Sequence, residues 1–440
     1  MEWLRKSASE IGRGIGTGAV DPVEMTEAYL DAAQAHPFGN RIYARLTRDR
    51  ALAEAIAAHD RAKQGLRRGL LDGVPISWKD LFDTAGVLTE AGSLLLEGRV
   101  PAQDAEVLAR ATRAGLVCLG KTHMTELAFS GLGVNPSTAT PPNIHDPKLA
   151  PGGSSSGAAT SVAFGLAAAG IGSDTGGSIR LPAAWNDLVG FKPTHGVLPL
   201  TGVVPLAESF DTVGPLCRSV EDCSEIFAVL AGRPATDLRG ASLQGTRLLV
   251  LNPWSTDVRD APRDAFLSAV ERLTRAGAQI DRAEIPAVDE AMETTLSLFT
   301  AEAYGTWGKV IEADPDKMFW RIRDRFRQGA TVPAAAFVAL WQRLRVLRAD
   351  YARATAAYDA VLIPSAANLP PDVDMLDSDD DYFVTENLLT LRNTRVGNLM
   401  GACAITLPTG VPSTAIMLMG QPGTDARLLR LASAAEAALA

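Results

Sequence analysis

The 440-residue sequence has only four cysteines and five histidines, and it has no apolar run long enough to span a bilayer. The cysteines show no CxxC or other metal-type spacing, so we expect buried thiols of a cytoplasmic protein and no metal site. The best apolar stretch, residues 158–171, is too short and too rich in small residues for a membrane span. The N-terminus, MEWLRK, lacks the apolar segment of a secretory signal. We therefore expect neither a membrane-spanning nor a secreted protein.

The net charge of the chain is moderate. Its 42 basic and 51 acidic residues give a net charge of −9, without a long block of like charges. Nucleic acids and anionic membranes bind proteins through dense positive charge, so neither is expected as a direct partner. The 47% hydrophobic content is enough for a large core, and the length alone would suggest two or three domains.

The histidines do not form a recognisable catalytic arrangement. A serine hydroxyl needs a base to take its proton as it attacks, and histidine is the usual choice. His36 and His59 lie in or at the end of predicted helices, whereas His123, His145 and His195 lie near loops without a matching Ser/Asp arrangement. The pattern therefore argues against a histidine triad.

Two segments rich in glycine and serine are the most distinctive feature of the chain. Residues 152–157, GGSSSG, precede an Ala-rich run at 158–169 that predicts a buried helix. Residues 174–178, DTGGS, follow a short apolar segment and open another helical piece at 179–180. Glycines in such loops let consecutive backbone N–H groups point at one place, which makes an anion site. Neither GxGxxG after a strand nor GxxxxGK[ST] is present, so a phosphate site is not indicated, and plain connecting loops remain the alternative.

Helices followed by glycine and then by a short strand recur along the chain, which favours strands joined by crossover helices. Asp21 and Pro22 give the first helix a strong start, and Gly115 is expected to cap a later one. The predicted helices are 22–35, 48–64, 103–114 and 261–277. The predicted strands are 116–119, 248–251, 278–280 and 360–363.

The C-terminal half is read as helical over residues 287–358. The stretch 364–381 follows it and carries six aspartates, so we expect a solvated or mobile loop there.

These motifs resemble the amidase signature family of serine hydrolases. The GGSSSG segment at 152–157 is similar to that family's GGSS(G/S)G, and Ser154 and Ser178 have its separation of 24 positions. GVPISWKD at 73–80 resembles the family's G(I/V)P(I/V)xxKD turn, which carries a lysine. The resemblance is continuous over about 71–232 and weaker elsewhere.

The resemblance implies an α/β fold with one large domain, residues 1–440. Its centre would be a twisted, mostly parallel mixed sheet covered by helices. Within it we expect N-terminal helices in 1–65, the catalytic motifs in 71–232, and a helical region in 287–395 that shapes the substrate pocket.

The resemblance also implies the roles of three residues. Ser178 would be the nucleophile, Lys79 the base, and Ser154 the relay between them, with the Gly153–Ser154 peptide bond in the cis form. A lysine can act as a base only when it is neutral, and burial lowers its pKa from the ordinary value of about 10.4. We expect kcat/KM to rise with pH above the range of a histidine.

Further residues around the nucleophile are assigned by the same resemblance. Asp174 and Arg180, which flank the nucleophile loop, and Ser155 are read as supporting residues that fix loop geometry. The oxyanion hole would be formed by the backbone N–H groups of Thr175, Gly176, Gly177 and Ser178.

The expected activity is hydrolysis of the C–N bond of a small carboxamide through an acyl-enzyme, without a cofactor or metal, giving an acid and ammonia or an amine. One alternative is the glutamine-hydrolysing A subunit of a tRNA-dependent amidotransferase, although Ser156 stands where that subunit commonly has glycine. The stretch 413–420 also departs from the family's PxGLQxxG strand. Another alternative is a catalytically silent binding or assembly subunit. The expected partner is a small-molecule amide, and the sequence allows a homo-oligomer.

Overall fold

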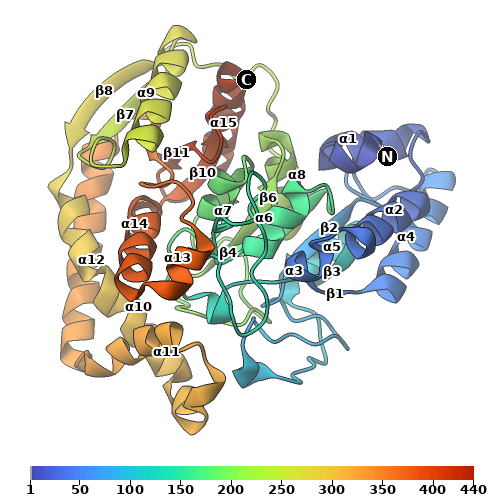
Figure 1. Cartoon of the computed structure of the whole chain (residues 1–440). Coiled ribbons are helices and arrows are strands. Elements are labelled where there is room, and N and C mark those ends of the chain that lie inside the picture. Colours follow the sequence, from blue (N-terminus) through green and yellow to red (C-terminus); the bar gives the residue numbers. More distant parts are fainter. Residues whose placement is uncertain (1) are drawn as a thin grey trace.

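A computed structural model describes residues 2–440, and across that range eleven strands form a single sheet (Figure 1). The strand order is β1-β3-β2-β4-β6-β5-β10-β11-β9-β7-β8. The strands are β1 (Tyr43–Leu46), β2 (Pro75–Lys79), β3 (Val117–Thr122), β4 (Ala169–Asp174), β5 (Val189–Lys192), β6 (Thr212–Cys217), β7 (Arg247–Asn252), β8 (Gln279–Glu284), β9 (Ala360–Pro364), β10 (Cys403–Pro408) and β11 (Ala415–Gly420).

The mixed α/β sheet confirms the expected fold class, but parallel pairing is less common than the sequence predicts. Parallel pairs occur in two groups, β3–β2–β4 and β9–β7–β8. The edge strand β1 and the strands in the middle of the sheet pair antiparallel. The short turn between β10 and β11 explains one such pair, because parallel neighbours need a long crossover connection.

Alternating side chains along the strands separate two cores, one on each face of the sheet. In β9, Leu362 belongs to the first core, whereas Val361 and Ile363 belong to the second. Helices α9 (Asp260–Arg275) and α15 (Asp425–Leu439) contribute to the first core. The second core is covered by α10 (Pro286–Ala313), α12 (Ala334–Thr355) and α14 (Asp380–Leu399).

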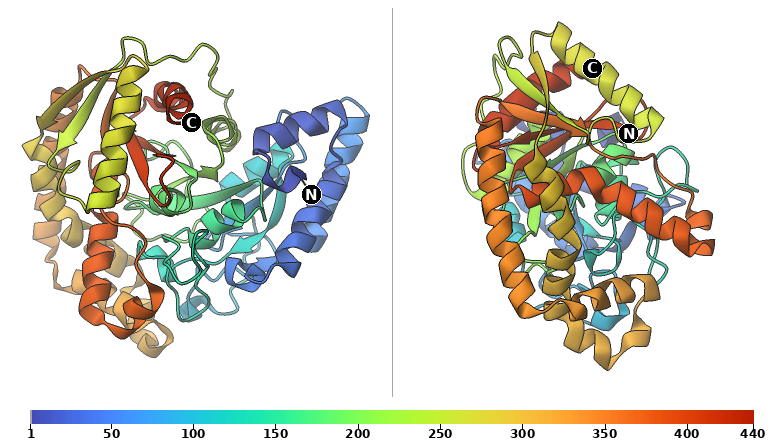
Figure 2. Two further views of the ribbon diagram at one scale, coloured as in Figure 1. Left: turned by 45° about the horizontal axis from the view of Figure 1, so that its top comes forward. Right: turned by 90° about the vertical axis from the view of Figure 1, so that its left-hand side faces the viewer.

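The N-terminal helices lie on the opposite side of the molecule from α10 and α12 (Figures 1 and 2). Asp21 caps α2 by accepting hydrogen bonds from the backbone N–H groups of Val23 and Glu24, which confirms the predicted start. The strand β1 interrupts this region and was not predicted. The helices are α1 (Ala8–Thr17), α2 (Pro22–Ala35), α3 (Gly39–Ile42) and α4 (Arg48–Lys63).

The helices between β2 and β7 include one that is shorter than expected. The Ala-rich run gives α6 (Ser156–Ala163), which ends before Gly165, a residue with φ of 75°, so the predicted helix over 158–169 was too long. Gly115, with φ of 94°, caps α5 as predicted. The other helices of this part are α5 (Glu106–Ala114), α7 (Arg180–Trp185) and α8 (Val220–Ala231).

The predicted acidic loop is partly helical, which corrects the expectation for residues 364–381. Two of its aspartates cap helices: Asp372 caps α13 (Val373–Ser378), and Asp379 caps α14. Aspartate is a preferred N-cap, so these acids fix helix starts instead of forming a solvated loop. The helical region before β9 is confirmed and also contains α11 (Trp320–Arg327).

The cysteines are free and buried, as the sequence predicts. Within residues 2–440, no helix combines the length and apolar character needed to cross a bilayer. In the same residues, no group of three or more His, Cys, Asp or Glu side chains is placed to hold a metal ion. The cysteines are Cys118, Cys217, Cys223 and Cys403.

Candidate active site

Two neighbouring parallel strands bring the sequence motifs together. β2 ends at Lys79 and β4 ends at Asp174, and the pairing of β2 with β4 places both ends at the same edge of the sheet. The loop after β4 carries Ser178, and the loop before α6 carries Ser154. The backbone N–H of Ser155 donates to the Ser178 carbonyl at 3.3 Å, which joins the two loops.

The Lys79 amine is fully buried between two hydroxyl groups. Its Nζ donates to Ser154 Oγ at 2.7 Å and to Ser173 Oγ at 2.8 Å, and the residue is 0% exposed. Burial lowers the pKa of Lys79 to about 7, although the charges of Asp211 and Asp174 act in the opposite direction. A large fraction of this amine is therefore neutral at neutral pH.

Ser173 is a site residue to which the sequence reasoning gave no role. A polar side chain inside a buried strand needs a partner, and this is the signal that could have drawn attention to it. Ser155 supports it: Ser155 Oγ donates to the Ser173 carbonyl at 3.2 Å and accepts from the Ser173 N–H at 3.3 Å. Ser155 therefore contacts Ser173, which in turn contacts Lys79.

Ser178 lies in the loop after β4 and is 5% exposed. Within residues 2–440 its hydroxyl makes no hydrogen bond. Lys79 is therefore hydrogen-bonded to Ser154, but Ser154 is not hydrogen-bonded to Ser178. The Gly153–Ser154 peptide bond is cis, as the resemblance implies.

A fully buried ion pair holds the loop that carries Ser178. Asp174 accepts from Arg180 Nη2 at 2.8 Å, from the Gly177 N–H at 2.9 Å and from the Ile179 N–H at 3.1 Å. Asn398 Nδ2 also donates to Asp174 at 2.9 Å. Burial opposes ionisation of Asp174, but Arg180 and the other donors outweigh it and lower its pKa to about 2. Asp174 and Arg180 thus hold the loop through these contacts, and their role in catalysis stays a prediction.

The backbone N–H groups of the loop divide into two sets. The Gly177 N–H is committed to Asp174, so it does not point at the site, and this corrects its assignment to the oxyanion hole. The N–H groups of Thr175, Gly176 and Ser178 make no hydrogen bond within residues 2–440. Only these three remain free to bind a developing negative charge.

Helix α14 packs directly on the loop. Thr394 Oγ1 donates to the Gly176 carbonyl at 2.7 Å. Gly177 has φ of 133°, and a Cβ there would clash with the Thr394 side chain, so glycine is required for both reasons. The loop is therefore held from the helical region as well as from its own strand.

None of the histidines bonds to Ser178 within residues 2–440. His59 pairs with Asp21 at 2.6 Å and His145 pairs with Asp187 at 2.8 Å, so both rings contact carboxylates outside the two serine loops. Burial lowers the pKa of His123 to about 4.

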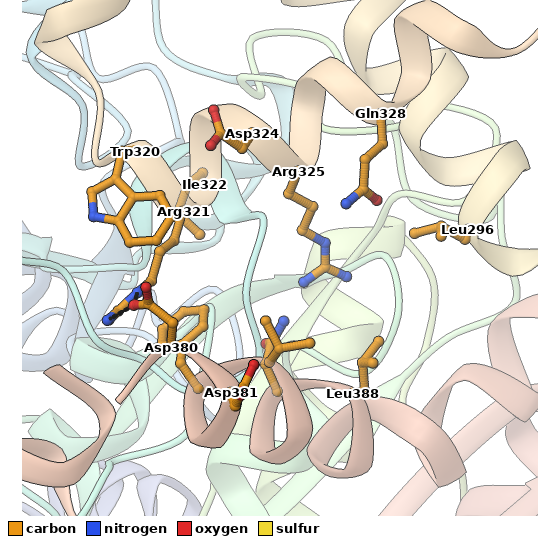
Figure 3. Close-up of a pocket in the computed structure, with 13 residues that line it drawn as sticks. Leu296, Trp320, Arg321, Ile322, Asp324, Arg325, Gln328, Asp380, Asp381 and Leu388 are labelled. Carbon is orange, nitrogen blue, oxygen red and sulfur yellow. Dashed lines mark hydrogen bonds and ion pairs between the residues drawn. The ribbon is translucent and has the colours of Figure 1, made fainter. Parts of the chain in front are cut away.

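A cavity of about 20 Å³ lies beside Ser178, Thr175 and Gly176, enough for about one water molecule. It shares lining residues with a cavity of about 490 Å³, which is within the usual size range of small-molecule sites. A third cavity, of about 390 Å³, lies between α11 and α14 and shares Arg325 with the other two (Figure 3). The first two cavities share Phe129, Phe299, Arg325 and Arg395.

The two arginines of this shared lining, Arg325 and Arg395, were not singled out from the sequence. They lie within the region 287–395, which was expected to shape the pocket, but no motif distinguishes them from the other arginines of that region.

Comparisons with known proteins give the class of this fold and site. A family model described as Amidase matches residues 24–429. A 2-amino-5-chloromuconic acid deaminase of Comamonas testosteroni is 34% identical and aligns over 88% of this chain and 86% of its own. The A subunit of the glutamyl-tRNA(Gln) amidotransferase of Anaeromyxobacter sp. (strain K) is 32% identical over 99% of this chain and 96% of its own. A crystal structure of an amidase superposes with a TM-score of 0.88 and 28% identity, covering 98% of this chain and 99% of that one.

The fold and the matches define a hydrolase that acts on C–N bonds. The chain belongs to the amidase family.

The buried ion pair generates a prediction about stability. Asp174→Asn removes the charge that neutralises buried Arg180 while keeping the shape of the side chain. Breaking a buried pair by removing one partner costs about 3–5 kcal/mol, so the free energy of unfolding should fall by that amount in urea titrations. The control is Asp237→Asn, which breaks an exposed pair with Arg239 and should change the free energy by less than about 1 kcal/mol. Equal effects of the two substitutions would contradict this account.

Proposed function

We propose that the protein hydrolyses the C–N bond of a small carboxamide through an acyl-enzyme on Ser178, with Lys79 as the base and Ser154 as the relay. The observation that carries this proposal is the Lys79 amine, which is buried, has a pKa of about 7, and contacts Ser154 Oγ at 2.7 Å. A base with a pKa near the working pH is the most effective kind of proton acceptor.

The hydrogen-bonding capacity of a neutral amine suits this role. Neutral Lys79 has two N–H donors and one lone pair, so it can donate to Ser173 while it accepts the Ser154 proton. As Ser178 Oγ bonds to the carbonyl carbon, its proton passes to Ser154 Oγ and the Ser154 proton passes to Lys79 Nζ. Catalytic hydrogen bonds are often long before substrate binds and tighten in the complex, which is the proposal for the Ser154 to Ser178 link.

The remaining steps use the free N–H groups and then water. The N–H groups of Thr175, Gly176 and Ser178 would stabilise the oxyanion, an effect typically worth about 10²–10³ in rate for one donor. The C–N bond then breaks, and the proton held by Lys79 returns through Ser154 to the departing nitrogen. Water attacks the acyl group by the same proton path, releases the carboxylic acid and restores Ser178.

Sequence relatives support a small-molecule substrate and one alternative. The 34% identity with a deaminase of 2-amino-5-chloromuconic acid favours a small substrate. The 32% identity with the A subunit of an amidotransferase supports glutamine hydrolysis within a larger complex as the second candidate. Purification with two partner chains would favour the second candidate, and activity of the isolated chain on simple amides would favour the first.

The presence of Lys79, Ser154 and Ser178 argues against a silent subunit. The free, buried thiols support a cytoplasmic location.

Ser178→Ala should reduce ammonia release from a simple amide by about 10⁴-fold or more, because it deletes the nucleophile. The melting temperature should stay unchanged, since the substitution adds no volume to the loop. A fluorophosphonate should label Ser178 in the wild type, as mapped by mass spectrometry. Covalent label at another serine would overturn the assignment.

Ser154→Ala should slow turnover by about 10²–10⁴-fold, the usual worth of a general acid–base group, and should slow fluorophosphonate labelling of Ser178 as well. Ser156→Ala is the matched control in the same loop, because its hydroxyl contacts only the His123 carbonyl, at 3.5 Å. A normal rate in Ser154→Ala would show that Lys79 does not act through that residue.

The pH dependence of kcat/KM should follow the ionisation of Lys79, rising as pH passes about 7 and levelling off on the alkaline side. This midpoint is lower than the sequence suggested, so its position alone does not separate a lysine from a histidine. Variants do separate them: Lys79→Met should lose this limb and most of the activity, whereas His123→Ala, His145→Ala and His195→Ala should keep it. A limb that survives in Lys79→Met would contradict the proposal.

A further inference from the structure

Two arginines from different helices reach the cavity beside the nucleophile. Arg325 comes from α11 and Arg395 from α14, and both line the small cavity together with Ser178. Figure 3 shows Arg325 projecting from α11 into the space between α11 and α14. Arg395 lies closer to the loop: its Nε is 3.9 Å from the point that a Cβ at Gly176 would occupy.

Within residues 2–440, neither guanidinium group has a hydrogen-bond or ion-pair partner, although Arg325 lies over the Phe129 ring at 4.5 Å. Arg395 is only 7% exposed, and its Nε is buried without a hydrogen bond. Arg325 is partly buried, and its Nη1 is likewise buried without a hydrogen bond. Within residues 2–440, neither residue forms an ion pair with a carboxylate. Leaving a buried cation without an ion pair costs free energy. A bound anion would supply the missing partner.

Other arginines around the same cavities do have anionic partners. Arg392, on α14 one turn before Arg395, pairs with Asp257 at 2.8 Å. Arg321, on α11 one turn before Arg325, pairs with Asp380. Among the arginines that line these cavities, the two beside Ser178 are therefore the ones without an ion pair within residues 2–440.

The two guanidinium groups are also close enough to affect one another. Burial, followed by the charge of Arg325, lowers the pKa of Arg395 to about 9, and burial lowers the pKa of Arg325 to about 10. Both side chains still carry their charge at neutral pH. The cavity thus holds two neighbouring positive charges that repel each other.

The cavities nearest Ser178 lack the acidic side chains that a positively charged ligand group would need. No Asp or Glu lines either of the two cavities nearest Ser178, within the part of the chain that the structure describes. The acids Asp324, Asp380 and Asp381 line the third cavity, which Arg325 also borders. The inner site therefore favours a bound anion and disfavours a bound ammonium group.

We propose that Arg325 and Arg395 bind a carboxylate on the acyl part of the substrate, which makes the substrate class the monoamides of short dicarboxylic acids that lack an α-amino group. Arginine binds carboxylates through paired N–H···O bonds, and two unpartnered guanidinium groups offer several such donors. The carboxylate lies a few bonds from the scissile carbonyl, because Arg395 and Gly176 line the same small cavity. The inference rests on the proposed amide hydrolysis and specifies what it acts on.

Three matched amides test the charge requirement by their rates of ammonia release. Glutaric acid monoamide carries the carboxylate alone, its methyl ester removes the charge, and L-glutamine adds an α-ammonium group. The wild type should prefer the monoamide over each of the other two by about 100-fold in kcat/KM, the worth of hydrogen bonds to a charged group. Equal rates for the monoamide and its methyl ester would overturn the proposal, and so would a preference for L-glutamine.

Substitutions test whether the two arginines cause the preference for the monoamide. Arg395→Met and Arg325→Met should each lower kcat/KM for the monoamide by about 10- to 100-fold, mainly through KM, and leave the rate with the methyl ester near that of the wild type. Arg395→Lys should restore part of the preference. Arg327→Gln is the control, because Arg327 lies on the same helix and pairs with Glu312 away from the cavity. Unchanged discrimination in both Met variants would contradict the assignment.

Two further measurements keep this test separate from the proposed function. Fluorophosphonate labelling of Ser178 should be normal in Arg325→Met and Arg395→Met, whereas failure to label the wild type would reject the hydrolytic mechanism itself. Glutarate, the product of the monoamide, should raise the melting temperature of the wild type but not of the double Met variant. An equal shift in both proteins would reject the carboxylate site while leaving the mechanism standing.

Discussion

The burial of the Lys79 amine between two serine hydroxyls is the contact on which the site depends. Burial disfavours the charged form, and the hydroxyls of Ser154 and Ser173 can accommodate a neutral amine without requiring a counter-ion. The contact exists because β2 and β4 are parallel neighbours whose ends meet at one edge of the sheet. The same edge presents the loop with Ser178. A shift of one residue in β2 would turn Lys79 to the other face of the sheet and separate it from Ser154.

The arginines around this edge of the sheet differ in whether they have an ion-pair partner. Asp174 and Arg180 form a fully buried pair whose hydrogen bonds are mostly used within the protein, and this pair gives the nucleophile loop one conformation. Arg325 and Arg395 have no such partner, although they line the cavity next to the same loop. Leaving two buried arginines without an ion pair is costly, and the proposed carboxylate site would account for that cost. Such costs persist where function uses them.

Local sequence determined much of the fold and most of the candidate site. The caps at Asp21 and Gly115 were readable because capping depends on a few adjacent residues. Lys79, Ser154 and Ser178 stood in short motifs that resemble a known family. The strand directions were less accessible, since pairing depends on contacts between segments far apart in the chain, and the acidic stretch was misread because Asp372 and Asp379 are helix caps. Arg325 and Arg395 could not be recognised at all, because what distinguishes them is the lack of an ion-pair partner in three dimensions within residues 2–440.

The central claim is that Lys79 is a neutral base near physiological pH, and its ionisation can be measured without any turnover. In the Ser178→Ala protein, NMR of ¹⁵Nζ-labelled lysine, assigned by comparison with Lys79→Met, would follow the amine across the pH range. The account predicts a pKa of about 7 for Lys79. A value near about 10.4, that of an unperturbed lysine, would mean that the amine is charged at neutral pH and would contradict the account.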